Sequence, residues 1–168
     1  MLHPLSRPAS VLSIRAAFVA IACSLAAPAL GGVIPPAPIQ AALDLLQWSP
    51  DRVPMIEVVE VRPLRVSPLA EAWTVYNADG SARRTIYVAG WSALYRAALA
   101  NGLDVHLDVI RLAGVLAHER AHVEHGPNEE LAYIAQLVTL ERLRAHDIDL
   151  SNVRRALEVV KRQQRGRR

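Results

Sequence analysis

The spacing of hydrophobic residues changes near Gly90, and this change divides the chain into two kinds of predicted structure. Before Gly90, apolar residues alternate with polar ones or form short β-branched runs, which is typical of strands. After Gly90, apolar residues recur every three or four positions, as they do on one face of a helix. A further short amphipathic helix is predicted ahead of the strands, at residues 39–48, because Ile39, Leu43 and Leu46 share one face.

The segments before Gly90 predict a small antiparallel sheet. Residues 55–64 are rich in β-branched side chains and predict a strand that ends at Pro63. A hairpin is predicted next. Trp73, Val75 and their neighbours form its first arm, residues 77–80 form its turn, and residues 85–89 form its return arm.

Helices are predicted for the rest of the chain. Gly126-Pro127 interrupts the helical pattern, and Asn128 and Ser151 are suitable N-caps. The order of helix, small antiparallel sheet and several helices indicates the α+β class. The predicted helices span 91–100, 105 or 108 to 125, 128–145 and 151–162.

The first residues have the character of a targeting segment. Residues 1–29 combine a basic start with an apolar run that is short for a membrane span, and they end in the small-x-small pattern Ala27-Pro28-Ala29. We therefore expect a signal peptide at 1–29, followed by a Pro-rich arm at 30–37. Two alternatives are an uncleaved N-terminal membrane anchor and lipidation of Cys23.

The remaining chain is predicted to form one domain at 38–163 with a basic tail at 164–168. Signal cleavage would remove the only cysteine, so any metal site must use His, Asp or Glu. It would also remove Arg7 and Arg15, which lowers the formal charge from +3 to +1. The basic tail is expected to be solvated, or alternatively to contact an anionic cell-envelope surface. Nucleic acid is not expected as a partner of an exported protein.

The segment HERAH in the central predicted helix carries the candidate chemistry. Residues four apart on a helix lie about 40° from each other around its axis, so His118 and His122 project side by side and can share one ion. Glu119 points about 100° away from His118, which suits a general base better than a ligand. This pattern predicts a site for Zn²⁺, which favours imidazole nitrogen and tetrahedral coordination.

A catalytic zinc site of this kind needs a third protein ligand. His125 lies about 10.5 Å along the helix from His118, too far for one ion to bind both readily. The break at residues 126–127 turns the chain and places two glutamates in the first turn of the next helix. Glu129 is the predicted third ligand, because it shares a face with small and polar residues, and Glu130 remains the alternative.

These residues resemble the zincin metallopeptidases, in particular the small gluzincin-like kind, over residues 85 to about 143. The resemblance implies zinc held by His118, His122 and a later glutamate, with Glu119 as the base. It also implies that an edge strand at 85–89 lies beside the active-site helix and pairs with extended substrate.

Two positions depart from the family pattern, where apolar or small residues are usual. Arg120 follows the His-Glu pair, and Glu124 is the second residue after His122. The two are spaced i,i+4, so we expect them to form an ion pair on an exposed back face of the helix.

The sequence therefore predicts an exported, periplasmic or secreted zinc metallopeptidase that hydrolyses peptide bonds in a peptide or protein substrate. A zinc-activated water would attack the carbonyl, Glu119 would act as the general base, and Tyr133 or His125 would hydrogen-bond the oxyanion. The alternative is a non-catalytic metal-binding or structural interaction module of the cell envelope, which would hydrolyse nothing.

Overall fold

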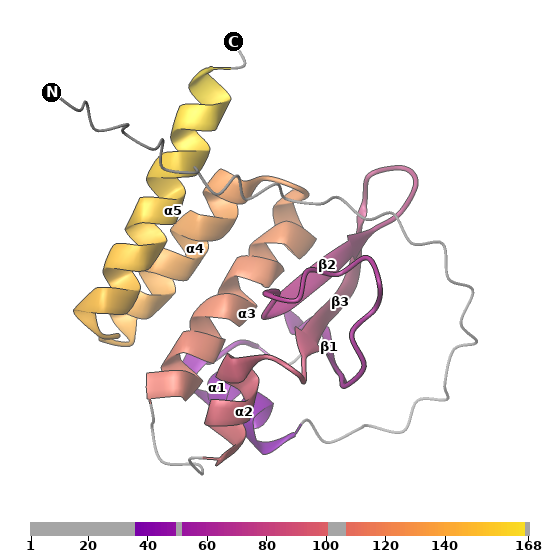
Figure 1. Cartoon of the computed structure of the whole chain (residues 1–168), viewed down its shortest axis with the longest axis vertical. Coiled ribbons are helices and arrows are strands. Elements are labelled where there is room, and N and C mark those ends of the chain that lie inside the picture. The colour runs from indigo at the N-terminus through magenta and orange to yellow at the C-terminus, as the bar shows by residue number, and fades with distance from the viewer. Residues whose placement is uncertain (1–35, 50–51, 101–106, 167–168) are drawn as a thin grey trace, which may run out of the picture.

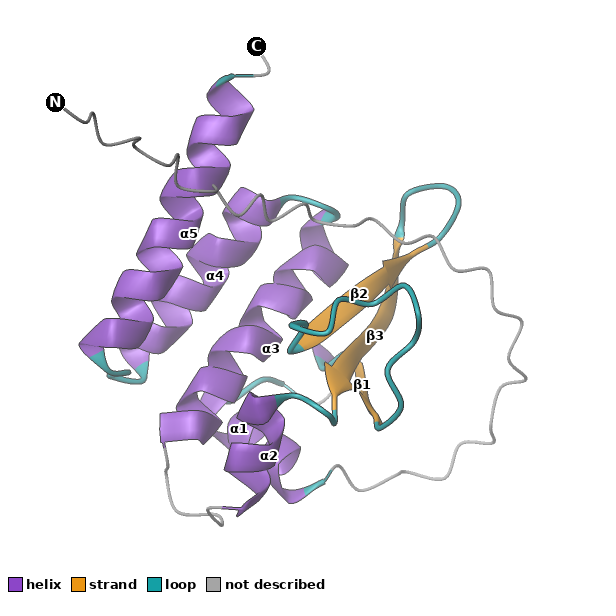
Figure 2. Cartoon of the chain, in the orientation of Figure 1, coloured by secondary structure: helices purple, strands orange, loops and turns teal. Residues whose placement is uncertain are grey.

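The computed structural model describes residues 36–49, 52–100 and 107–166, and it has an α+β fold, as predicted (Figures 1 and 2). The predicted signal at 1–29, Cys23 and most of the Pro-rich arm lie outside the described residues. Within the described ranges, no helix combines the length and apolar character needed to cross a membrane. The elements are α1 (Ala37–Leu46), β1 (Met55–Val59), β2 (Ala72–Tyr76), β3 (Ala82–Ala89), α2 (Ala93–Ala100), α3 (Leu107–His125), α4 (Glu129–Arg142) and α5 (Asp147–Arg165).

The predicted hairpin is present as β2 and β3. The two strands pair antiparallel, with Thr74 opposite Ile86, and the register shifts between Thr74 and Tyr76. The turn is closed by a hydrogen bond of 3.0 Å from the Gly80 N–H to the Asn77 carbonyl, and Gly80 adopts a positive φ of 82°. Glycine suits this position because the left-handed conformation is strained for residues with a Cβ.

The prediction of a purely antiparallel sheet is wrong, because β1 pairs with β3 in parallel and the sheet is mixed. The strand order β1-β3-β2 also places β3 in the middle, so residues 85–89 are not the edge strand expected beside the active site. The connection at 60–71 crosses from β1 to the other side of β3. Strand β2 is therefore the edge strand that faces the C-terminal half of α3.

The helices match the predicted ones with small differences at their ends. Helix α1 begins at Ala37, inside the predicted arm, and α5 extends to Arg165, so the predicted tail begins as helix. Ser151 is not an N-cap, because α5 starts four residues earlier, at Asp147. Asp147 and Asp149 occupy its first turn, where their negative charge interacts favourably with the helix dipole.

Helix α3 is the central element of the fold, between the sheet on one side and α4 on the other (Figure 1). Its residues from Leu112 to Ala117 are buried without interruption. Leu112 and Leu116 pack with Ile86 of β3 and Ile39 of α1 in the main hydrophobic core. Because α3 is buried on all sides, its packing in the core fixes the position of the helix. The side chains of its next turn are therefore held in place as well.

Helices α3 and α4 approach each other most closely around Gly114. A Cβ atom at this position would lie 2.7 Å from Cδ2 and 2.9 Å from Cγ of Leu140, which is itself buried. The absence of a side chain at Gly114 therefore lets α4 lie directly against α3. This close packing brings the start of α4 back toward the histidines of α3.

We expect Gly114→Val to lower the free energy of unfolding by about 1–3 kcal/mol, because the new methyl groups overlap Leu140 in a packed interior. Leu140→Ala alone should cost about 2–5 kcal/mol by leaving a cavity. Combined, the two changes should cost less than their sum, since the alanine makes room for the valine. Urea unfolding of the three variants measures this coupling, and strictly additive losses would contradict the contact.

Candidate metal centre

The last two turns of α3 bring His118 and His122 together, as the sequence predicts. Their Nε2 atoms lie 3.2 Å apart. The Nδ1 atom of His122 lies 3.1 Å from the carbonyl oxygen of Gly126, which can only accept a hydrogen bond. This Nδ1 therefore carries the proton and donates it, and the Nε2 lone pair of His122 is left free to bind a metal.

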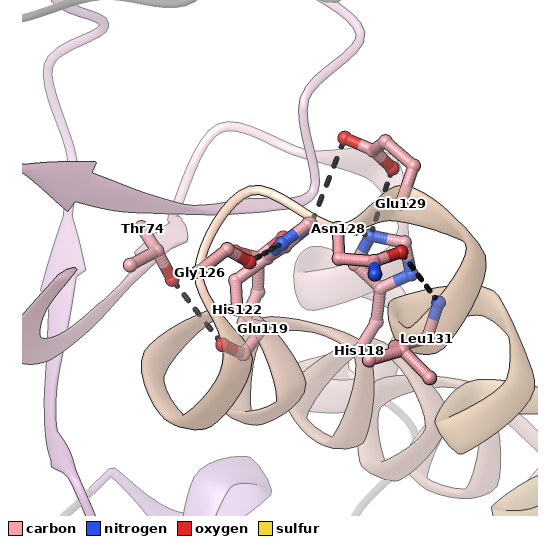
Figure 3. Close-up of polar contacts among 8 residues, drawn as sticks. All are labelled: Thr74, His118, Glu119, His122, Gly126, Asn128, Glu129 and Leu131. Carbon is pink, nitrogen blue, oxygen red and sulfur yellow. Dashed lines mark hydrogen bonds and ion pairs between the residues drawn. The ribbon is translucent and has the colours of Figure 1, made fainter. Parts of the chain in front are cut away.

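The turn after α3 returns a carboxylate to the two histidines. Gly126 adopts a φ of 71°, and the Asn128 side chain accepts a hydrogen bond of 3.2 Å from the Leu131 N–H, which caps α4. The first residue of α4 is Glu129. Its Oε2 lies 3.6 Å from Nε2 of His118, and its Oε1 lies 3.6 Å from Nε2 of His122 (Figure 3).

The spacing of these three groups fits a tetrahedral ion. Bonds of about 2.0–2.1 Å from a tetrahedral zinc separate its ligand atoms by about 3.3 Å. The two Nε2 atoms lie 3.2 Å apart, and each lies 3.6 Å from a different oxygen of Glu129, so all three side chains are within reach of one ion. Among the described residues, His118, His122 and Glu129 are the group that could hold a metal, and Glu130 does not belong to it. Two imidazoles and one carboxylate suit Zn²⁺ and leave its fourth position open.

Glu119 lies beside this group and is buried, with 8% of its surface exposed. Its Oε2 accepts a hydrogen bond of 2.9 Å from the hydroxyl of Thr74 on β2 (Figure 3). Burial raises the pKa of Glu119 to about 7, and the neighbouring His122 and the Thr74 hydrogen bond oppose this rise. A carboxylate with a pKa near neutrality can both accept and return a proton.

His118 is held as a neutral imidazole. Burial and, to a smaller extent, the neighbouring His122 lower its pKa to about 3, and the side chain of Gln136 opposes the shift. Its Nδ1 atom is buried and has no hydrogen-bond partner among the described residues. The ring of Tyr133 stands edge-on to it, with 4.7 Å between the ring centroids. A neutral imidazole is the form that binds a metal ion.

The sequence pattern does not single out Thr74 and Tyr76, although both contact the site from β2. The ring centroids of Tyr76 and His122 lie 6.5 Å apart, and the Tyr76 hydroxyl is buried with no hydrogen-bond partner in residues 36–49, 52–100 and 107–166. Burial and the charges of Glu119 and Glu129 raise the Tyr76 pKa to about 12. Strand alternation places Thr74 and Tyr76 on one face, but only the tertiary fold shows that this face meets α3.

The two residues that depart from the zincin pattern lie on the other side of α3. The predicted ion pair is confirmed, with 2.7 Å between Nε of Arg120 and Oε1 of Glu124. The guanidinium of Arg120 also lies 4.5 Å over the ring of Trp48, so this face is partly covered rather than open. His125 is exposed and lies 3.9 Å from Glu124, outside the metal-binding group.

A scan against protein-family models, a search of curated proteins and a search of solved structures each found no match.

We expect the purified protein to bind one Zn²⁺, and Glu129→Gln to weaken this binding by about 10-fold or more, because a charged ligand is lost. Glu130→Gln is the matched control, since it makes the same change one residue away. Competition with a chelator of known affinity measures the zinc dissociation constant. A larger loss in Glu130→Gln than in Glu129→Gln would reverse the assignment.

We expect the contribution of His118 to the stability of the metal-free protein to fall in mild acid. Its pKa in the folded state, about 3, lies below the ordinary value of 6.5, so the unfolded chain binds a proton that the folded protein excludes. This contribution is full above pH 6.5 and falls as the pH decreases from 6.5 toward 3. Glu119 acts in the opposite direction over an overlapping range, because its pKa is raised from 4.5 to about 7, so the effect of His118 is measured by comparison with a variant.

Urea unfolding of the metal-free protein between about pH 7 and pH 5 measures this dependence. The stability of His118→Gln relative to the unmodified protein should rise as the pH falls over this range, whereas that of His125→Gln, at an exposed position, should stay constant. Identical slopes in all three proteins would contradict the proposed burial of a neutral His118.

Proposed function

We propose that this protein is a zinc-dependent metallopeptidase that hydrolyses peptide bonds. The observation that supports this best is the convergence of His118, His122 and Glu129 beside a buried carboxylate, Glu119, that is not part of the metal-binding group. A purely structural zinc site would have four protein ligands and no need of a neighbouring base.

The proposed chemistry divides between the metal and Glu119. Zinc, when bound, supplies a Lewis acid that polarises a carbonyl group and makes water more acidic. The carboxylate of Glu119 takes the proton from the attacking water and passes it to the leaving amine. The hydroxyl of Thr74 fixes one carboxylate oxygen, Oε2, which leaves Oε1 as the atom that accepts and returns the proton.

Tyr133 is the proposed hydrogen-bond donor to the substrate carbonyl. Together with His118 and Glu119 it lines a cavity of about 290 Å³ next to the metal-binding group. Tyr76 is less suited to this role, because its hydroxyl is enclosed by protein. Burial and the neighbouring carboxylates raise the pKa of Tyr133, so its hydroxyl keeps its proton and can donate it to a developing oxyanion.

The edge strand β2 is the proposed place for the peptide backbone. Within the described residues, β2 pairs with β3 on one side only. Its Thr74 contacts Glu119, so an extended peptide added along the strand would run past the base. Export by the predicted signal, and contact of the basic C-terminal tail with an anionic cell-envelope surface, remain part of the proposal.

We expect Glu119→Gln to keep its zinc and to lose about 10²- to 10⁴-fold in kcat/KM for peptide hydrolysis, because the amide cannot accept the proton. Glu124→Gln, which makes the same change at an exposed position of α3, should retain activity. Zinc analysis and hydrolysis of a peptide mixture followed by mass spectrometry measure both properties. Zinc-loaded protein that hydrolyses no peptide would favour the non-catalytic alternative.

A further inference from the structure

Two adjoining cavities extend from the metal-binding group along α3. The first has a volume of about 290 Å³ and reaches His118 and Glu119, and the second has about 540 Å³ and reaches the N-terminal turns of α3 and α5. We call the pair the trough. Their combined size is within the range of ligand sites in proteins. Both cavities are lined by Glu71, Val115, Gln136, Asn152 and Val153.

Glu71 is fixed at the wall that the two cavities share. It directly precedes β2, and its carbonyl accepts a hydrogen bond of 2.9 Å from the Ala89 N–H, so its backbone is held by the sheet. Its side chain is open to water in the trough. No hydrogen bond or ion pair to its carboxylate is formed within the described residues. This acid therefore has room for a partner from outside the chain.

The charged groups around Glu71 form no ion pair with its carboxylate within the described residues. The nearby cation is Arg111, whose guanidinium already bonds Asp149 at 2.9 Å and Asp108 at 3.1 Å. The surrounding protein raises the pKa of the Glu71 carboxyl, and the charge of Arg111 opposes this rise. At the far cavity, Oδ2 of Asp149 is buried and lacks a hydrogen-bond partner in the part of the chain that the structure describes. Arg111 is thus occupied by two aspartates, which leaves the Glu71 carboxylate available for a cationic ligand.

We propose that Glu71 is a specificity-determining residue that binds an ammonium or guanidinium group of the substrate. The preferred substrates are then peptides with a cationic group close to the bond that is cut. The methylene stem of a lysine or arginine would pack on Val115 and Val153, with the charged end at the carboxylate. The inference rests on the proposed peptidase function, because it names the substrate class of the same site.

The test compares lysine with norleucine, which keeps the aliphatic stem and lacks the charge. Cleavage of a peptide mixture by the zinc-loaded protein, read by mass spectrometry, first identifies the position at which basic residues are enriched. Matched acetylated peptides with lysine or norleucine at that position then give kcat/KM. We expect the lysine peptide to be preferred by about 10- to 100-fold, as for a hydrogen bond to a charged group.

Glu71→Gln should bring this ratio close to one, and Glu71→Lys should favour a glutamate peptide instead. Glu57→Gln is the matched control, because Glu57 is an exposed acid on β1, at the opposite edge of the sheet, and it should keep the preference. A lysine peptide with a free N-terminus, compared with its acetylated form, tells whether the bound cation is the side chain or the terminal amine.

Binding provides a readout that does not depend on turnover. Calorimetry with zinc-loaded Glu119→Gln protein should show tighter binding of the lysine peptide than of the norleucine peptide, and Glu71→Gln in the same protein should remove the difference. Hydrolysis without preference, or a preference that survives Glu71→Gln, would overturn the role of Glu71 and leave the peptidase function standing. If no peptide is hydrolysed, the peptidase proposal fails, and equal affinities in calorimetry overturn the role of Glu71 as well.

Discussion

The contact between α3 and α4 at Gly114 and Leu140 is the constraint on which the candidate metal centre depends. His118 and His122 belong to α3, whereas Glu129 belongs to α4, and their donor atoms must converge within a few ångströms. A side chain at Gly114 would overlap Leu140, so either the leucine or the whole of α4 would have to shift. The close approach of α3 and α4 at Gly114 thus determines both the packing of the core and the distances between the donor atoms.

The same packing also creates the electrostatic character of the site. Burial of the end of α3 keeps His118 neutral and raises the pKa of Glu119, since charge is disfavoured away from water. A buried carboxyl group with a raised pKa is costly for a fold that lacks a ligand. Perturbed groups of this kind concentrate at functional sites, where a metal or a substrate offsets their cost.

Local patterns in the sequence predict the helices and the members of the metal-binding group. The i,i+4 spacing of the histidines is a property of a single helix, so the sequence was enough to place them. The helical face favoured Glu129 and left Glu130 as the alternative, because the choice depends on how α4 packs against α3. The position of β3 in the middle of the sheet depends on pairing with β1, which lies far away in the sequence, and it was wrongly predicted as an edge strand. The sequence did not identify Thr74 and Glu71 as site residues for the same reason. Their roles depend on which edge of the sheet lies against α3.

Arg120 illustrates how the fold accommodates a residue that the zincin pattern would replace with an apolar one. Its guanidinium lies over the ring of Trp48 and pairs with Glu124, so the charge is balanced at the surface. Its aliphatic stem can cover the helix in the way that an apolar side chain would. The arginine thereby shields the back of α3 while its charged end pairs with Glu124. The departure from the pattern therefore lies on the side of α3 away from the metal-binding group and does not disturb the donor atoms.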